Sequence, residues 1–90
     1  MATMIVTIVH GEMDTDTTER ISALAFLLRP WWVRTHGTND TTTYHLSDSV
    51  RLDYLIDCIV DNAEWYWRAV IEYHGTTLCI PRAKAPVELN

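Results

Sequence analysis

The chain is poor in glycine and cysteine, and each shortage excludes a class of protein. Only three of its 90 residues are glycine, and none lies in a phosphate-binding pattern such as G-x-G-x-x-G. Two cysteines, Cys58 and Cys79, are too few for a disulfide scaffold. Because Cys58 falls in a helical pattern and Cys79 in a strand pattern, we expect two small buried thiols, with a disulfide between them as the less favoured alternative.

Long apolar runs and an excess of basic residues are also missing. No stretch approaches the roughly 18 apolar residues that cross a bilayer, and residues 1–9 lack the basic start of a signal peptide. We therefore expect a cytoplasmic protein that does not bind membranes. Seven basic residues against twelve acidic ones give a net charge of −5. Because a negative domain repels phosphate, direct nucleic-acid binding is disfavoured and a basic protein surface is the natural partner.

Sequence signatures of catalysis are absent as well. The patterns G-x-S-x-G, C-x-x-C and H-E-x-x-H do not occur in the chain. Several acidic pairs exist, but the sequence alone assigns them no acid and base roles. We therefore expect a protein that is not an enzyme, with no catalytic residue, no bound metal and no cofactor.

Hydrophobic periodicity at the start of the chain predicts a strand and then a helix. Residues 4–9 form an apolar, β-branched run, which is typical of a strand covered on both faces. The spacing of Asp16 and Glu19 is that of a capping box, so it predicts a helix start there, and Pro30 predicts the end. The apolar positions of this helix share one face: Ile21, Leu24, Ala25 and Leu28.

The middle of the chain predicts a hairpin and a second helix. Residues 31–36 and 41–46 are strand candidates joined by turn-forming residues 37–40, with Thr42, Tyr44 and Leu46 on one face. Residues 47–49 include serines that can cap a following helix. Six apolar residues of that helix recur at amphipathic spacing: Leu52, Leu55, Ile56, Ile59, Val60 and Ala63.

The last part of the chain predicts a second hairpin. Residues 65–74 alternate with a period of two, residues 75–77 turn the chain, and residues 78–80 form a short edge strand before Pro81. The resulting order, β-α-β-β-α-β-β, predicts an α+β fold. We expect a ferredoxin-like two-layer sandwich with an antiparallel sheet and both helices on one face. One domain would span residues 1–82, and residues 83–90 would form a flexible tail.

Four acidic residues recur along the solvent side of the second predicted helix: Asp53, Asp57, Asp61 and Glu64. No lysine or arginine follows the same azimuth, so like charges repel along the row. One interpretation is a solvated face that keeps a small protein in solution. The other is a docking surface for a basic partner, with charges spaced like the phosphates of nucleic acid. A second acidic cluster could extend this surface: Glu12, Asp14, Asp16 and Glu19.

All three glycines follow a histidine, in the pairs His10-Gly11, His36-Gly37 and His74-Gly75. One interpretation is that glycine closes each strand where a positive φ is needed and the histidines are incidental. The other is that the three strand ends converge and the imidazoles bind zinc or a similar metal. Because the predicted topology does not require the three turns to lie at one edge of the sheet, the first interpretation is favoured.

Aromatic residues adjacent in a strand must point to opposite faces, which applies to Trp31 and Trp32 and to Tyr66 beside its tryptophan neighbours. We therefore expect some of these rings, together with Tyr44, on the outer face of the sheet. There Trp32 and Tyr66 would anchor a protein interface, including self-association across the sheet. The alternative is that a loop or the C-terminal tail covers them.

In size, charge and lack of catalytic residues, the chain is similar to small acidic accessory proteins of phages and mobile elements. Some of those proteins inhibit host nucleic-acid-handling complexes, including CRISPR effectors. The resemblance implies a protein-binding inhibitor acting through Asp53, Asp57, Asp61, Glu64 and the two aromatic anchors, on a larger protein or complex with a basic surface. The alternative is a dimeric regulatory domain that binds a small ligand or a metal at the His-Gly turns.

Overall fold

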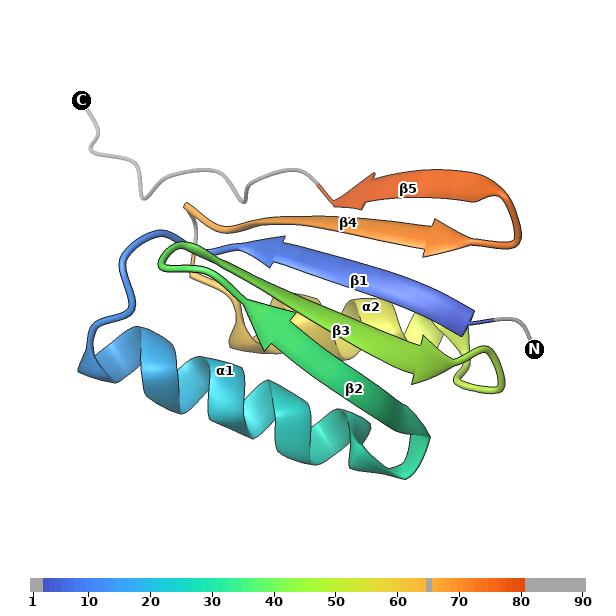
Figure 1. Cartoon of the computed structure of the whole chain (residues 1–90), viewed down its shortest axis with the longest axis horizontal. Helices are drawn as coiled ribbons and strands as arrows, with labels where there is room; N and C mark the ends of the chain where they lie inside the picture. The colour runs from blue at the N-terminus through green and yellow to red at the C-terminus, as the bar shows by residue number, and fades with distance from the viewer. Residues whose placement is uncertain (1–2, 65, 81–90) are drawn as a thin grey trace.

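The computed structural model describes residues 3–64 and 66–80. It confirms an α+β fold with a five-stranded antiparallel sheet and two helices. The elements in chain order are β1 (Thr3–Val9), α1 (Thr15–Leu28), the 3-10 helix η1 (Arg29–Trp31), β2 (Trp32–Gly37), β3 (Thr41–Ser47), α2 (Leu52–Asn62), β4 (Arg68–Tyr73) and β5 (Thr76–Ile80). The strand order across the sheet is β2-β3-β1-β4-β5 (Figure 1). The tail expected over residues 83–90 lies outside the described residues.

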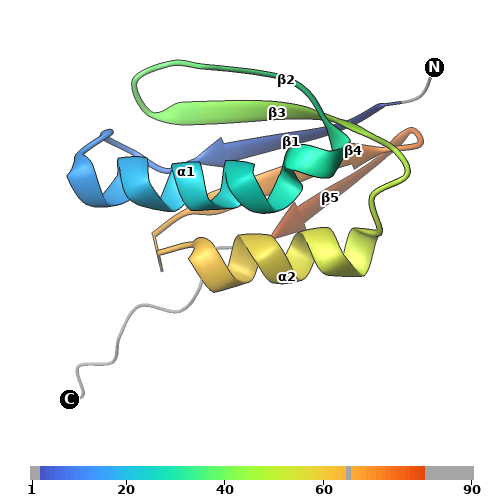
Figure 2. The same cartoon turned by 90° about the horizontal axis from the view of Figure 1, so that it is seen from below.

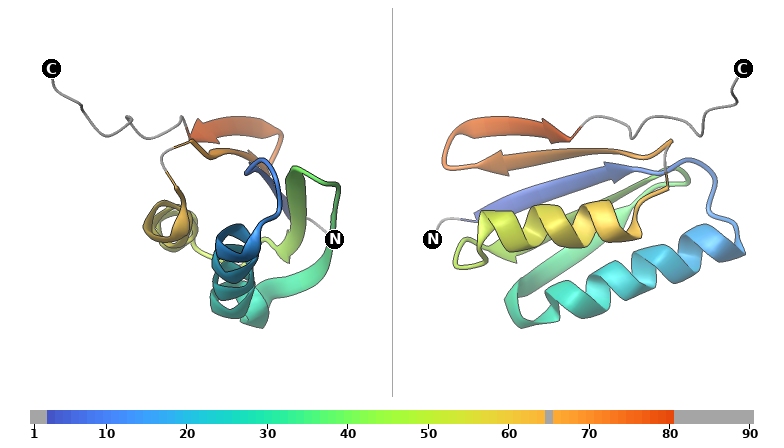
Figure 3. Two further views of the ribbon diagram at one scale, coloured as in Figure 1. Left: turned by 90° about the vertical axis from the view of Figure 1, so that its left-hand side faces the viewer. Right: turned by 180° about the vertical axis from the view of Figure 1, so that it is seen from behind.

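Both helices lie against the same side of the sheet, as Figures 2 and 3 show. The period of two decides which side chains meet them: Met4, Val6 and Ile8 of β1 are fully buried, whereas Ile5 and Thr7 between them are partly exposed on the outer face. The prediction that Thr42, Tyr44 and Leu46 share one face of β3 is confirmed, and that face is buried against the helices. The predicted buried face of the first helix is confirmed as well, with Ala25 only partly buried. The core is thus a single layer between helices and sheet.

Helix α1 begins two residues earlier than the capping-box spacing predicts. Its N-cap is Asp14, whose carboxylate accepts a hydrogen bond from the Thr17 backbone N–H at 2.8 Å. The prediction of Asp16 as the cap is therefore wrong, because Asp16 lies in the first turn and pairs instead with Arg20 at 3.1 Å. The hydrogen bonds from Thr17 hold the pKa of Asp14 below its ordinary value.

Replacing Asp14 by alanine is expected to lower the melting temperature at neutral pH, since a backbone N–H at the helix start loses its acceptor. Because the folded-state pKa of Asp14 lies below the unfolded one, this stabilisation is present above the unfolded pKa and is lost as pH falls through the folded pKa. Thermal denaturation of wild type and D14A from pH 7 down to pH 2 should show the two curves converging. The neutral cap of D14N should retain the stability at both ends, and an equal loss in D14N would contradict a capping role.

Helix α2 departs from its predicted pattern at both its start and its buried face. Its N-cap is Arg51, which makes no side-chain capping bond, so the prediction of a serine cap is wrong. The serines bond each other instead, with 2.9 Å between the Ser47 and Ser49 hydroxyl oxygens. Val60 is 56% exposed, although its spacing predicts burial, because Leu55, Cys58 and Ile59 face the core and Val60 lies to one side of them.

The two C-terminal strands form the expected hairpin, but their bounds differ from those predicted. Strand β4 begins only at Arg68, and residue 65, where it was predicted to begin, lies outside the described residues. The hairpin turns at His74 and Gly75, with φ of 49° and 78°, and β5 then begins at Thr76 rather than at residue 78. Two consecutive positive φ values match the right-handed twist of a hairpin, and histidine and glycine tolerate them better than most residues.

The two cysteines are free and differ in burial. Cys58 is buried on the core side of α2, as predicted. Cys79 is exposed, so the prediction of a buried thiol there is wrong: it alternates with Leu78 and Ile80 and faces away from the helices. No helix within the described ranges is long and apolar enough to cross a membrane.

Candidate functional site

Large hydrophobic side chains are exposed together where α1 ends, η1 follows and α2 begins. Among the described residues, five of the eight large hydrophobic side chains with high exposure come from this part of the structure, and half-buried Trp31 lies among them. We call this set the aromatic end: Phe26, Leu27, Trp31, Trp32, Val33 and Tyr54. Such a concentration of exposed apolar side chains is typical of a protein interface.

Contacts within the aromatic end hold several of its rings in place before any partner arrives. The rings of Trp31 and Tyr54 are 5.5 Å apart and tilted, and the Tyr54 hydroxyl donates a hydrogen bond to the Leu27 carbonyl at 3.4 Å. The Arg29 guanidinium lies 4.2 Å from the centre of the Phe26 ring. Because these rings are already ordered, binding through them costs little side-chain entropy.

The acidic residues of α2 do not form the uninterrupted row that the sequence predicts. Asp53 pairs with Arg51 at 2.7 Å, and this guanidinium holds the pKa of Asp53 below its ordinary value. Arg51 precedes the helix and pairs with Asp53 two residues later, so the expectation that no basic residue interrupts the row is wrong. Asp57 and Asp61 are exposed and form no ion pair within the described part of the chain. They follow Tyr54 at i+3 and i+7, so they continue the same side of α2.

Glu64 lies beyond the end of α2 and is half-buried rather than part of an open surface. Its carboxylate is 3.2 Å from Arg20, which also bonds Asp16 and donates to the Asn62 carbonyl at 3.2 Å. The hydrogen bond with Asp16 is the main reason that the pKa of Arg20 is raised. Arg20 thus ties α1 to the C-terminal end of α2, where a cation also offsets the helix dipole.

The two predicted aromatic anchors lie at opposite ends of the molecule. Trp32 pairs with Leu46 near the end of β3, is 49% exposed and donates from its indole N–H to the Thr35 hydroxyl. Tyr66 lies in the connection before β4, half-buried against the core. The first residue of β4, two residues after Tyr66 in the chain, lies level with the first residue of β3. Leu46 is five residues further along β3, which at 3.4 Å per residue is about 17 Å away. Trp32 belongs to the aromatic end, and Tyr66 does not.

The predicted aromatic platform on the outer sheet face is absent from the described residues. Tyr44 points inward, fully buried, and its hydroxyl donates to the Ile21 carbonyl at 3.1 Å. Burial also raises the pKa of this hydroxyl. Trp31 belongs to η1 and contacts α2, not the sheet face. The outer face instead carries threonine and β-branched residues, with histidines at its β2–β3 end.

The three His-Gly turns do not converge. His10 is buried at the end of β1 and both ring nitrogens are occupied: Nδ1 donates to the Gly11 carbonyl and Nε2 lies 2.8 Å from the Thr42 hydroxyl. His74 lies at the opposite end of the sheet, in the β4–β5 turn. Only Gly11 and Gly75 have positive φ; Gly37 is needed for space, because a Cβ there would lie 2.6 Å from the Thr41 carbonyl oxygen. The three histidines of the His-Gly turns therefore cannot bind one metal ion together.

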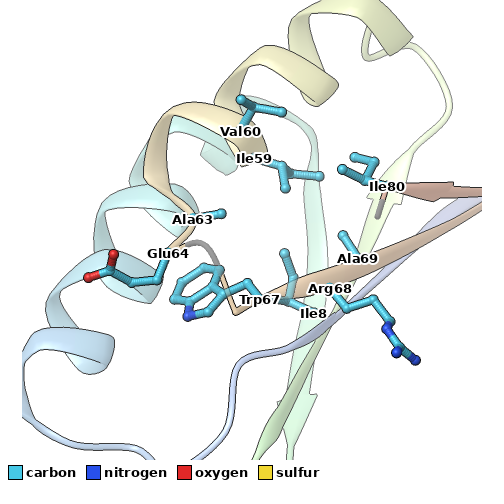
Figure 4. Close-up of a pocket in the computed structure, with 9 residues that line it drawn as sticks. All are labelled: Ile8, Ile59, Val60, Ala63, Glu64, Trp67, Arg68, Ala69 and Ile80. Carbon is cyan, nitrogen blue, oxygen red and sulfur yellow. The ribbon is translucent and has the colours of Figure 1, made fainter. Parts of the chain in front are cut away.

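A hollow opens between α2 and the β4–β5 hairpin (Figure 4). It encloses about 380 Å³, including space open to solvent, and its lining is mainly apolar, with buried Trp67 beside Ile80 and Val60. Of the residues that the structure describes, Glu64 and Arg68 are the charged ones that line it, and Glu64 is already paired with Arg20. The hollow exists because β5 extends the sheet beyond α2, so this side of the hairpin lacks a covering helix (Figure 3).

Sequence reasoning missed Phe26, Leu27, Val33 and Tyr54 as surface residues. A signal was present: Phe26 and Leu27 lie off the azimuth of Leu24 and Leu28, the buried face of α1, and Tyr54 lies off that of Leu55 and Ile59. Apolar residues on the polar face of an amphipathic helix are candidates for a binding surface. Comparison with protein-family models, curated proteins and solved structures finds no match to this chain.

Proposed function

We propose that this chain is a non-enzymatic protein-binding module that docks on a basic surface of a larger protein through its helix layer. The observation that carries the proposal is the aromatic end, where ordered rings are exposed beside unpaired carboxylates. Phe26, Trp32 and Tyr54 would be buried at the centre of the interface, where aromatic residues supply most of the binding energy. Asp57 and Asp61 would steer a basic partner from the rim.

We propose further that the partner handles nucleic acid and that the chain inhibits it by occupying its phosphate-binding surface. Such surfaces carry clustered lysine and arginine, and they attract any exposed row of carboxylates. The net charge of −5 and the free carboxylates of α2 support this choice of partner. Like the accessory proteins of phages and mobile elements, the chain would act by binding alone.

Charge reversal tests the acidic part of this surface. D57K/D61K is expected to lose a partner that wild type captures from lysate, because two attractive contacts become repulsive, with affinity falling at least ~10-fold at physiological salt. The matched control is E12K/E72K, which changes the net charge equally, at exposed positions away from the aromatic end. Binding of the captured protein is then measured against increasing NaCl and against its own nucleic acid.

Three results would contradict the proposal. Equal retention by D57K/D61K and the control would remove the acidic residues from the interface. If the captured partner still binds nucleic acid when it is saturated with the wild-type chain, the chain does not inhibit it by occupying its phosphate-binding surface. If no protein is retained above bare beads, the protein-binding function itself is wrong.

We also propose that the first six main elements form a ferredoxin-like core, to which β5 is added. The strand order supports this, since α1 connects β1 to β2 with β3 between them, and α2 connects β3 to β4 with β1 between them. Two interleaved βαβ units of this kind define the split βαβ plan. In this plan the helices share one face, which leaves their outer surface free for a partner.

A second candidate function is a small-ligand-binding regulatory domain, and the hollow beside α2 favours it. Its lining is mainly apolar, as in ligand pockets, and Trp67, Ile80 and Val60 would contact a small apolar ligand. This candidate includes dimerisation, which light scattering detects. A melting temperature that rises with an apolar ligand, and not in a V60E variant, would favour this function over protein docking.

A further inference from the structure

Two histidines, exposed His36 and partly exposed His45, face each other on the outer side of the sheet. His36 of β2 and His45 of β3 have their Nε2 atoms 3.2 Å apart and their ring centres 5.2 Å apart. The strands are neighbours in the sheet (Figure 1), and His45 also pairs across with Ile5, whose side chain is on the outer face. Two ring nitrogens of different residues therefore point at one place on the surface.

A β-bulge brings these two rings to the same face. The pairing of β2 with β3 shifts by one residue between Trp32 and Arg34. Without this shift His36 would pair with Thr42, whose side chain faces the core, while His45 would still face outward. Because the bulge moves His36 opposite Thr43, it creates the pair, and bulges commonly redirect side chains at functional positions.

The contact itself shows which protonation states fit. At 3.2 Å one neutral imidazole donates from Nε2–H and the other accepts, because two facing N–H groups would repel. If the donor ring moves its proton to Nδ1, both Nε2 lone pairs point at the same place and no proton is lost. The pair can thus accept a metal ion by tautomerisation alone.

The distance between the nitrogens matches that of two imidazoles on one ion. With metal–nitrogen bonds of 2.0–2.1 Å, two nitrogens 3.2 Å apart subtend an angle of about 103° at the metal, near the tetrahedral value. We propose that His36 and His45 form a two-imidazole chelate for a divalent transition-metal ion of the zinc, nickel and copper class, for which imidazole is a preferred ligand.

The surroundings predict moderate affinity and an ion with open coordination positions. No third histidine, cysteine, aspartate or glutamate joins the pair within residues 3–64 and 66–80. Water or a ligand from another molecule would complete the coordination. Arg34 lies directly opposite His45 in the neighbouring strand and repels a cation, whereas Glu72 is two strands away on the other side of Ile5. The site lies on the face opposite the helix layer, so its test is independent of the proposed docking function.

Isothermal titration of the untagged chain with NiCl₂ and with ZnCl₂ tests the chelate. Wild type is expected to bind one ion per chain, and H36N and H45N are each expected to bind at least ~10-fold more weakly, because each loses one of two ligands. The matched control H74N removes an exposed histidine outside the pair and should bind like wild type. R34Q should bind more tightly than wild type, because a nearby positive charge is removed. Melting temperatures without metal verify that each variant is folded.

Equal affinities for wild type, H36N and H45N would overturn the proposal, as would no binding by wild type at millimolar metal. An equal loss in H74N would show non-specific histidine binding and would overturn it as well. A proton NMR titration with Cu²⁺ adds a structural readout: the Hε1 signals of His36 and His45 should broaden together, before those of His10 and His74. Broadening of His74 first would place the ion elsewhere.

Discussion

Replacing Tyr44 by alanine is expected to destabilise the fold by about 3–5 kcal/mol, the cost of truncating a buried aromatic ring. Tyr44 is fully buried between β3 and α1, and its hydroxyl satisfies the Ile21 carbonyl. A domain of this length has a total free energy of unfolding of about 5–13 kcal/mol, so the variant retains only part of it. The melting temperature should fall by roughly 15–30 °C, measured together with urea unfolding.

The matched variant Y44F separates the ring from its hydroxyl. It keeps the packing but leaves the Ile21 carbonyl without this donor, so we expect a loss of about 1 kcal/mol. A change below about 0.5 kcal/mol in Y44A would instead indicate an exposed ring on the outer sheet face, where we expected it from the sequence. The result decides directly which face of β3 packs against the helices.

The fold was largely predictable from periodicity because burial repeats with the geometry of each element. Alternation in β3 placed Thr42 and Tyr44 on one face, and the 3.6-residue period placed Leu24 and Leu28 on the core side of α1. Helix starts were less predictable, since either of two carboxylates two residues apart can cap a helix, and here Asp14 caps the helix that Asp16 was expected to cap. Tyr44 was predicted on the wrong face of the sheet, because the sequence does not show that its polar hydroxyl has a hydrogen-bond acceptor in the core.

The candidate site was less predictable because its pairings join residues far apart in the chain. Arg20 forms an ion pair with Glu64, which is 44 residues later in the sequence, and only the packing of α1 beside α2 brings them together. The pairing of His36 with His45 depends on a one-residue bulge, and the sequence gives no sign of its place. The Asp57 and Asp61 carboxylates, in contrast, are exposed as helical spacing predicted.

Replacing Phe26 and Trp32 together by alanine is expected to weaken binding of the captured partner by at least 2 kcal/mol, or about 30-fold. Both side chains are about half exposed or more, at 60% and 49%, so their loss should change the free energy of unfolding little. The control V60A removes a side chain of similar exposure from the lining of the hollow, six residues beyond Tyr54 in α2, and should leave affinity unchanged. Biolayer interferometry at physiological salt measures both. If V60A weakens binding and F26A/W32A does not, the partner binds at the hollow and the aromatic end is not its docking surface.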